Sequence, residues 1–444
     1  MKKFIIFGVV LALLVPSMAM AATEFSLGGF IKMDMMWDSD GNVGKNMNGL
    51  PSRNNDPNNK HGRLKFTAQG SRFNLTIKGP DLWGAKTSGF IEMDFDSTEK
   101  ELLGAGFTAS KSYTPRMRHA MFRFNWPTSE LLFGQYFSMF SEWYAESAED
   151  GPLQMTGTPT ARLAQVRFSQ TFLSDWTVAG LIGDPNQAFL NTGNVGPYNA
   201  NINNGQSAET PQIQGKIKYA HDFWGKAAYY GKPIPFTVQL VGGWQRNVMR
   251  NNSPVGFNAS GFGEQAAVTG FIVNRNQYVH PWMAMGSLFI PVIPTSSANL
   301  AGTASILTQW WIGQGIEAFG FTGTSGAKYR FDGFVGGPNL LLYDAELLNN
   351  FGGFVEGQYY FNNQWFVNAL YGLRKAFNVS RAQWLNTATI AGREMGFNNA
   401  NEPQTVQQMS ATLWYRPIQA IKFGLQYSYA AARYFAYANP NASL

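Results

Sequence analysis

The sequence predicts an all-β protein, an antiparallel transmembrane β-barrel, and three observations support this class. Segments of about ten residues alternate apolar and polar side chains, as strands of a membrane barrel do. Short connections built from turn-forming residues alternate with long polar ones. After the first residues, no apolar run approaches the roughly 20 residues of a transmembrane helix, so a helical membrane protein is excluded.

The alternation is clear in the first predicted strand. Phe25, Leu27 and Ile31 share one face, while Ser26 and Lys32 share the other. Successive residues of a strand point to opposite faces, so a wall between lipid and water needs an apolar side chain at every second position. The same pattern recurs in segments 72–78, 88–95, 119–125, 212–219, 236–245 and 421–429.

The connections and the aromatic residues give the predicted barrel two different rims. Tight turns are predicted at 79–81, 126–128, 362–364 and 416–417, and long Asn- and Gly-rich loops at 38–62, 184–209, 250–276 and 375–404. Rings gather near the short turns, where they would form an aromatic girdle at the membrane interface. These rings belong to Trp83, Trp126, Trp176, Trp224, Trp365, Trp414 and Tyr415.

The strand count is about fifteen, and single-chain bacterial barrels have an even number. The last predicted strand starts at Ile421, and the chain stops at Leu444 where an external loop is expected. We therefore expect a barrel of about sixteen strands when complete, with the last strand missing from this sequence. The alternative is a miscount between residues 278 and 351, where the alternation is hardest to follow.

The N-terminus predicts export. Two lysines precede the apolar run from Phe4 to Val15, and Ala19-Met20-Ala21 supplies a small-x-small cleavage site. A membrane anchor is the alternative, but the run is too short to cross a bilayer. We expect residues 1–21 to be a signal peptide and residues 22–444 to form the barrel.

Composition excludes several other classes. The chain has no cysteine, so disulfide frameworks and thiolate metal sites are ruled out. Charged residues make up only 14% and aromatic residues 15%, which suits a wall that is apolar on one face and polar on the other. The net charge of +6 is spread along the chain without a basic run, so no nucleic-acid partner is expected. We also expect no cofactor and no metal.

Several strand motifs resemble those of Gram-negative outer-membrane porins, and most resemble the DcaP-like trimeric porins. The motifs lie at 28–34, 71–73, 78–80, 87–95, 118–120, 132–135, 353–356 and 371–372. The resemblance implies an outer-membrane location, contact with the lipid bilayer and lipopolysaccharide, a homotrimer, and uptake of small anionic or dicarboxylic solutes. The chain departs from some members in lacking a helical extension before the barrel.

Strand parity predicts the charges that line the pore. Basic residues outnumber acidic ones, and a low-dielectric wall would focus their field to concentrate anions. The alternative is that these charges pair locally and only solvate the lumen. The predicted basic lining consists of Lys32, Lys65, Arg72, Lys78, Arg123, Arg167, Lys216, Lys218, Arg374 and Lys422. The predicted acidic lining consists of Asp34, Glu92, Asp94 and Glu356.

The third external connection, residues 141–160, is the candidate constriction loop. It carries Glu142, Glu146, Glu149 and Asp150 beside two aromatic residues. If it folds into the barrel, its carboxylates would face the arginines and create a field across the pore. If it does not, it is a solvated acidic loop.

Catalysis has little support in the sequence. The four histidines are scattered, and neither a Gly-x-Ser-x-Gly nor a His-Glu-x-x-His motif occurs. We therefore predict a porin for passive diffusion of small hydrophilic solutes, without enzyme activity and with a preference for anions. The alternatives are a secreted β-rich binding protein or adhesin, and a barrel-borne hydrolase with a Ser-His pair.

Overall fold

The computed structural model describes residues 23–39, 62–96, 99–101, 111–149, 153, 156–186, 205–249, 270–273, 277–321, 327–334, 340–377, 388–390, 393–395 and 403–434. The predicted signal peptide lies outside these residues, as do most of the long predicted loops.

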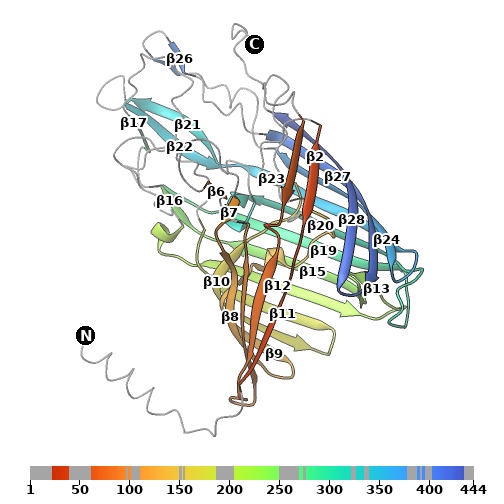
Figure 1. Ribbon diagram of the computed structural model, residues 1–444. Coiled ribbons are helices and arrows are strands. Elements are labelled where there is room, and N and C mark those ends of the chain that lie inside the picture. Colours follow the sequence, from red (N-terminus) through yellow and green to blue (C-terminus); the bar gives the residue numbers. More distant parts are fainter. Residues whose placement is uncertain are drawn as a thin grey trace.

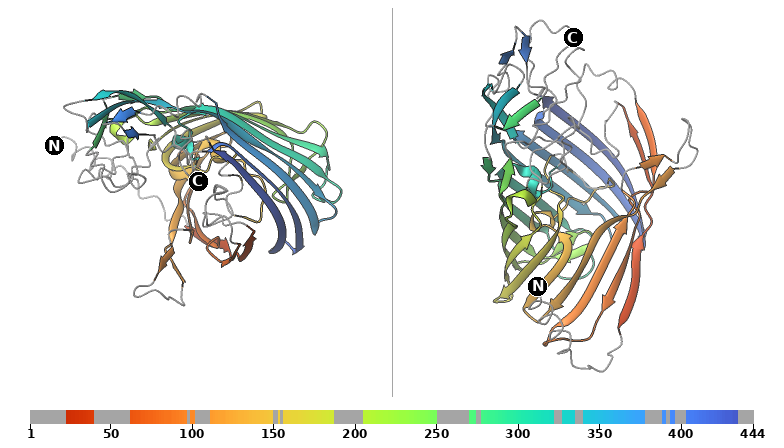
Figure 2. Two further views of the ribbon diagram at one scale, coloured as in Figure 1. Left: turned by 90° about the horizontal axis from the view of Figure 1, so that it is seen from above. Right: turned by 90° about the vertical axis from the view of Figure 1, so that its left-hand side faces the viewer.

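One large antiparallel sheet forms the fold, and within the described residues it has fifteen strands, the number counted from the sequence. The strands pair with their neighbours in chain order, from the first strand at one end to the last strand at the other, and the sheet curls round so that these two ends approach each other (Figures 1 and 2). Its strands are β1 (Glu24–Phe30), β4 (Arg72–Lys78), β5 (Lys86–Asp94), β8 (Arg116–Asn125), β9 (Ser129–Phe137), β10 (Arg162–Phe172), β11 (Trp176–Gly183), β12 (Gln212–His221), β15 (Phe236–Trp244), β19 (Trp282–Ile293), β20 (Ala304–Gln314), β23 (Asn349–Tyr360), β24 (Trp365–Ala376), β27 (Pro403–Ile418) and β28 (Ile421–Tyr434).

The remaining elements are short and lie in the connections. The strands are β2 (Asp34–Asp38), β3 (Arg63–Thr67), β6 (Glu99–Glu101), β7 (Lys111–Tyr113), β13 (Ala227–Tyr229), β14 (Lys232–Ile234), β16 (Asn247–Met249), β17 (Gly270–Val273), β18 (Gln277–Val279), β21 (Ala327–Phe334), β22 (Leu340–Leu347), β25 (Ala388–Ile390) and β26 (Arg393–Met395). In the described part of the chain, 3₁₀ turns accompany them at η2 (Met139–Ser141), η3 (Gln206–Ala208) and η5 (Ile316–Phe319). Among the described residues, none of the helices has the length and apolar character to cross a bilayer.

The predicted alternation is confirmed by the exposure of side chains on the two faces of the sheet. On β12, Ile213 and Ile217 are 47% and 48% exposed, whereas Gln212 and Gln214 are 0% and 2% exposed. A sheet that presents apolar side chains outward and glutamines inward inverts the order of a soluble protein. This inversion is what an all-β wall in a lipid bilayer requires.

The prediction of the aromatic girdle was wrong for Trp414. Trp83 and Trp224 are exposed near short turns, but Trp414 is 3% exposed and points into the barrel. Its ring stacks on Phe366 at 5.8 Å and its indole N–H donates to Asn368 at 2.8 Å. The tight turn predicted at 416–417 lies further along the chain, at 419–420. β27 continues to Ile418, because a shift in register with β28 accommodates Pro417 within the strand.

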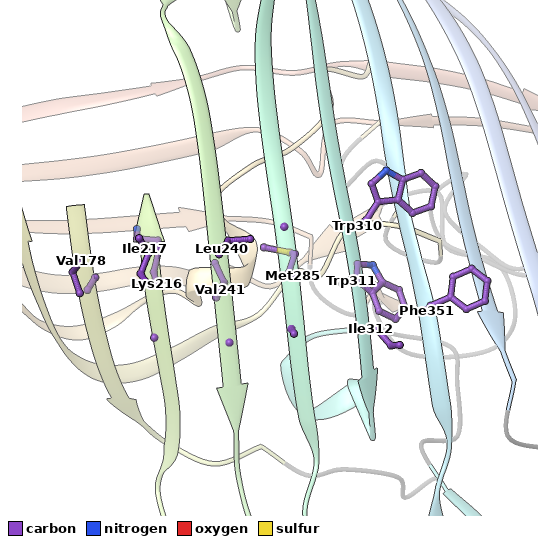
Figure 3. A pocket seen from close by; sticks show the side chains of 15 residues that line it. Val178, Lys216, Ile217, Leu240, Val241, Met285, Trp310, Trp311, Ile312 and Phe351 are labelled. Carbon is purple, nitrogen blue, oxygen red and sulfur yellow. The ribbon is translucent and has the colours of Figure 1, made fainter. Parts of the chain in front are cut away.

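The outer face also carries a groove where side chains are small. Four such residues lie side by side in register across β11, β12, β15 and β19, namely Gly180, Gly215, Gly242 and Ala284. The groove has a volume of about 870 Å³, and Leu240 and Trp310 are among the residues around it (Figure 3).

Candidate functional site

The connection between β9 and β10 begins at Ser138 and ends at Ala161, and we call it the inner loop because it folds into the barrel. Ser138 caps the 3₁₀ turn η2 by accepting from the Phe140 amide at 3.2 Å. The side-chain carbonyl of Gln214, an inward residue of β12, accepts from the Ser138 hydroxyl at 3.1 Å and from the Met139 amide at 2.8 Å. The first turn of the loop is thereby fixed to the inner face of the wall.

Glu142 forms the first ionic anchor of the inner loop. Its carboxylate accepts from Arg167 of β10 at 2.8 Å and from Lys216 of β12 at 2.6 Å. Burial alone would raise the pKa of Glu142, but the charges of Lys216 and Arg167 lower it below its ordinary value. This carboxylate is therefore held ionised, with two cations around it.

Glu146 forms the second anchor, on the far side of the barrel. Its carboxylate accepts from Lys422 of β28 at 2.8 Å and from Gln358 of β23 at 2.9 Å. Its backbone amide donates to Glu356 at 3.0 Å, and its carbonyl accepts from the Asn368 amide group. Buried carboxylates normally need such partners, and here the wall supplies one for each polar group.

Residues 147–149 of the inner loop are hydrogen-bonded to β27 and β28, the last two strands of the sheet. Gln426 accepts from the Ser147 hydroxyl and from the Ala148 amide, both at 2.8 Å, and Gln408 donates to Glu149 at 2.7 Å. Asp150 lies outside the described residues. The inner loop thus crosses the barrel from β12 to β28 and is joined to the wall at both ends of its path.

Glu149 is the anchor that should respond to pH. Its second carboxylate oxygen is buried without a hydrogen-bond partner in the described part of the chain. Burial raises the pKa of Glu149 to about 7, the Gln408 hydrogen bond and Lys32 oppose this, and Asp38 and Asp34 add to it. Because the folded pKa lies above the ordinary 4.5, the resulting stability is fully present below pH 4.5 and is lost as pH rises through about 7.

We therefore expect Glu149→Gln to be more stable than the parent protein at pH 8 and to show less dependence on pH. The measurement is the thermal unfolding midpoint of both proteins at pH 5 and pH 8. A parent protein whose midpoint changes with pH no more than that of the variant would contradict the raised pKa of this group.

The return leg of the inner loop lies directly on the backbone of β23. A Cβ atom on Gly157 would lie 2.6 Å from the carbonyl oxygen of Gly353, so a side chain at this position would push the loop away. The indole of Trp311 donates to the Gly157 carbonyl at 3.1 Å. Beneath the loop, Trp143 and Leu153 join inward side chains such as Phe354 in an apolar core. One side of the barrel interior is therefore filled.

An arginine group lies on strands near the start of the sheet. Arg118 donates to Glu92 at 2.7 Å and to Asp94 at 2.5 Å, and Arg116 donates to Asp94 at 2.7 Å. Arg116 also reaches Asp96 at 3.1 Å. The full arginine group is Arg72, Arg116, Arg118, Arg123 and Arg162.

Arg162 differs from the other members of the arginine group. Its guanidinium lies over the ring of Phe137 at 4.8 Å, and within the described residues no carboxylate pairs with it. Its Nε atom is buried without a hydrogen-bond partner among those residues. Tyr144 of the inner loop packs against Phe137 at 5.7 Å between ring centres. Arg162 is therefore a cation beside the loop whose charge is not neutralised by direct contact.

The other predicted lining residues differ in the partners that they contact. Lys32 pairs with Asp34, the first residue of β2, at 2.6 Å. Lys78 pairs with Glu24 at 2.9 Å, and both side chains are exposed at the short-turn end of β1 and β4. Lys218 lies on the inward face of β12 without a carboxylate partner in the described part of the chain. Of the remainder, Arg374 is buried and Lys65 is half-buried.

Three members of the arginine group, Arg116, Arg118 and Arg162, were missed by the parity of the sequence. Arg118 was noted only as part of a short motif, because the alternation of segment 119–125 gives the even-numbered positions an outward face. A register shift between β5 and β8 at Glu92 and Met93 places it inside as well. Arg162 begins β10 directly after the loop, where alternation gives no direction.

The fold and the inner loop together define the class as a β-barrel of the porin fold, with apolar side chains outward and a loop folded into its interior. The structure is similar to the outer-membrane channel DcaP of Acinetobacter baumannii, with a TM-score of 0.62 and 18% identity over 94% of this chain and 93% of that one. OmpF of Salmonella typhi, in complex with daunomycin, aligns at a TM-score of 0.46 with 9% identity over 91% of this chain and 89% of that one. OprB of Pseudomonas putida aligns at 0.46 with 10% identity over the same shares. No family model matches the sequence, and no curated protein does.

The similarity to the DcaP channel shows the fold, and it agrees with the resemblance seen in the strand motifs. The outward apolar band suits a sheet that lies in a bilayer, and the fold is that of the DcaP channel. The secreted soluble alternative does not account for this band, because a soluble protein would have to leave it in water.

Proposed function

We propose that the protein is a porin for passive diffusion of small hydrophilic solutes and that it prefers anions. The observation that carries this proposal is the separation of charges inside the barrel. Glu142 and Glu146 are tied to cations of the wall by ion pairs, whereas Arg162 keeps its positive charge uncompensated. A solute that passes the inner loop would meet an excess of positive charge in a medium of low dielectric constant.

We also propose that the barrel assembles as a homotrimer in contact with lipopolysaccharide. This part of the proposal is supported by the resemblance of the strand motifs, and its direct measure is the mass of the complex in mild detergent.

A hydrolase on the same barrel is not favoured by any group of side chains. His221 pairs with Asp175 at 2.9 Å at the short-turn rim, and the Ser174 hydroxyl is 3.4 Å from the same aspartate. Among the described residues, no hydrogen bond joins a serine hydroxyl to a histidine ring, which is the contact that activates a nucleophile.

The test is a planar lipid bilayer with a salt gradient across it. We expect stepwise conductance and a reversal potential on the anion-selective side. Cation selectivity would mean that carboxylates of the inner loop control the pore and would overturn the preference. Folded, inserted protein that gives no conductance would overturn the porin itself.

A further inference from the structure

A second element enters the barrel, from the end opposite to the origin of the inner loop. The connection between β12 and β15 contains its own hairpin, β13–β14, which we call the inner hairpin. Lys226 and Thr295 form a bridge at its base, and the Ser305 hydroxyl of β20 donates to the Ala228 carbonyl at 3.0 Å. Ala227 and Ala228 are both buried. The hairpin therefore lies on the inner face of the wall.

The tip of the inner hairpin meets the middle of the inner loop through two tyrosines. The Tyr144 amide donates to the Tyr229 hydroxyl at 3.2 Å, and the Tyr230 hydroxyl donates to the Ala145 carbonyl at 2.8 Å. The rings of Tyr229 and Trp143 also pack with their centres 5.0 Å apart. Backbone polar groups of two successive loop residues, the Tyr144 N–H and the Ala145 carbonyl, are therefore satisfied by two successive side chains of the hairpin.

The backbone of the hairpin turn shows that Tyr230 is an unusual residue for its position. Tyr229 pairs with Lys232, so the turn consists of Tyr230 and Gly231, with φ values of 49° and 75°. Such two-residue turns need a positive φ at both positions, and glycine or asparagine meets this need best. A tyrosine is strained at this position, and strain of this kind is retained where a side chain has a task.

We propose that the inner hairpin is the second half of the pore constriction and that Tyr229 and Tyr230 are positioning residues for the inner loop. This inference rests on the proposed porin function. The loop's ion pairs hold it at Glu142 and at Glu146, and the segment between them is held by the hairpin. The hairpin therefore sets how far this middle segment projects into the path of a solute.

The test uses the double variant Tyr229→Phe/Tyr230→Phe, which removes both hydroxyl groups and keeps both rings. Tyr219→Phe is the matched control, because Tyr219 lies on the outward face of β12 with its ring 4.7 Å from that of Trp176. Hydrogen exchange is measured on peptides covering residues 143–146. Separately, liposome swelling with neutral sugars of increasing size gives the size limit of the pore.

We expect amide exchange in this segment to be about tenfold faster in the double variant, which corresponds to about 1.4 kcal/mol for the lost hydrogen bond. We also expect larger sugars to enter, and neither change in Tyr219→Phe. Unchanged exchange would overturn the positioning role, and faster exchange with an unchanged size limit would overturn the role in the constriction. If the parent protein forms no pore, the proposed function fails, while the exchange measurement still tests the anchoring.

Discussion

Replacing Arg162 by glutamine should reduce the ratio of anion to cation permeability by at least about fivefold. One elementary charge changes the energy of a monovalent ion about 4 Å away by about 1 kcal/mol in water, and a larger amount in a lower dielectric. Arg162 has no carboxylate partner among the described residues, so its removal leaves no buried acid behind. The measurement is the reversal potential in a salt gradient, compared with that of the parent protein.

Arg246→Gln is the matched control for this prediction. Arg246 also stacks over an aromatic ring, that of Tyr278 at 4.9 Å, but it follows β15 at the long-loop end and lies outside the arginine group. Its replacement should leave the reversal potential close to the parent value. An equal change in both variants would show that selectivity follows overall charge, and the assignment of Arg162 to the constriction would then be wrong.

Replacing Glu142 by glutamine should destabilise the protein by about 3 to 5 kcal/mol and release the first part of the inner loop. Removing one partner of a buried ionic cluster leaves the others uncompensated, and here two cations, Arg167 and Lys216, lose the same carboxylate. We expect a lower thermal unfolding midpoint and noisier single-channel currents. Glu130→Gln is the control, since its pair with Arg123 is longer, at 3.5 Å, and both side chains are about a quarter exposed.

The same variant should show its largest effect at neutral pH. The folded pKa of Glu142 lies below its ordinary value of 4.5. The stability from its ion pairs is therefore present above pH 4.5 and is lost as pH falls through the lower folded value. The unfolding midpoints of Glu142→Gln and the parent protein should converge only in that acid range. A constant difference at all pH values would mean that the carboxylate acts through packing alone.

The sequence predicted the sheet well because each strand separates lipid from water and so carries a strict alternation. It was weakest between residues 278 and 351, and the reason is visible in β19 and β20. Pro291 interrupts β19 with a shift in register, and Trp310 and Trp311 put similar side chains on both faces of β20. Alternation cannot assign a face where an aromatic residue points each way.

The candidate site was only partly predictable. The acidic loop was identified from composition, but the cations that neutralise it come from strands up to 276 residues away, as Lys422 does for Glu146. Parity assigns a face and says nothing about which strand lies across the barrel. The inner hairpin was missed because its connection resembles an ordinary turn, and only the adjacent tyrosines, Tyr229 and Tyr230, mark it as different.

The filled interior beside the inner loop divides the barrel into two regions with different tolerance to change. On the filled side, Trp143, Leu153 and Phe354 pack as in the core of a soluble domain, so substitutions there act on folding. On the side of the arginine group, Arg118 and Asp94 form a buried pair whose disruption is costly, whereas Arg162 has no carboxylate partner among the described residues and can be replaced without leaving a buried acid behind. Solute preference can therefore diverge between related proteins along one wall, while the other wall keeps the loop in place.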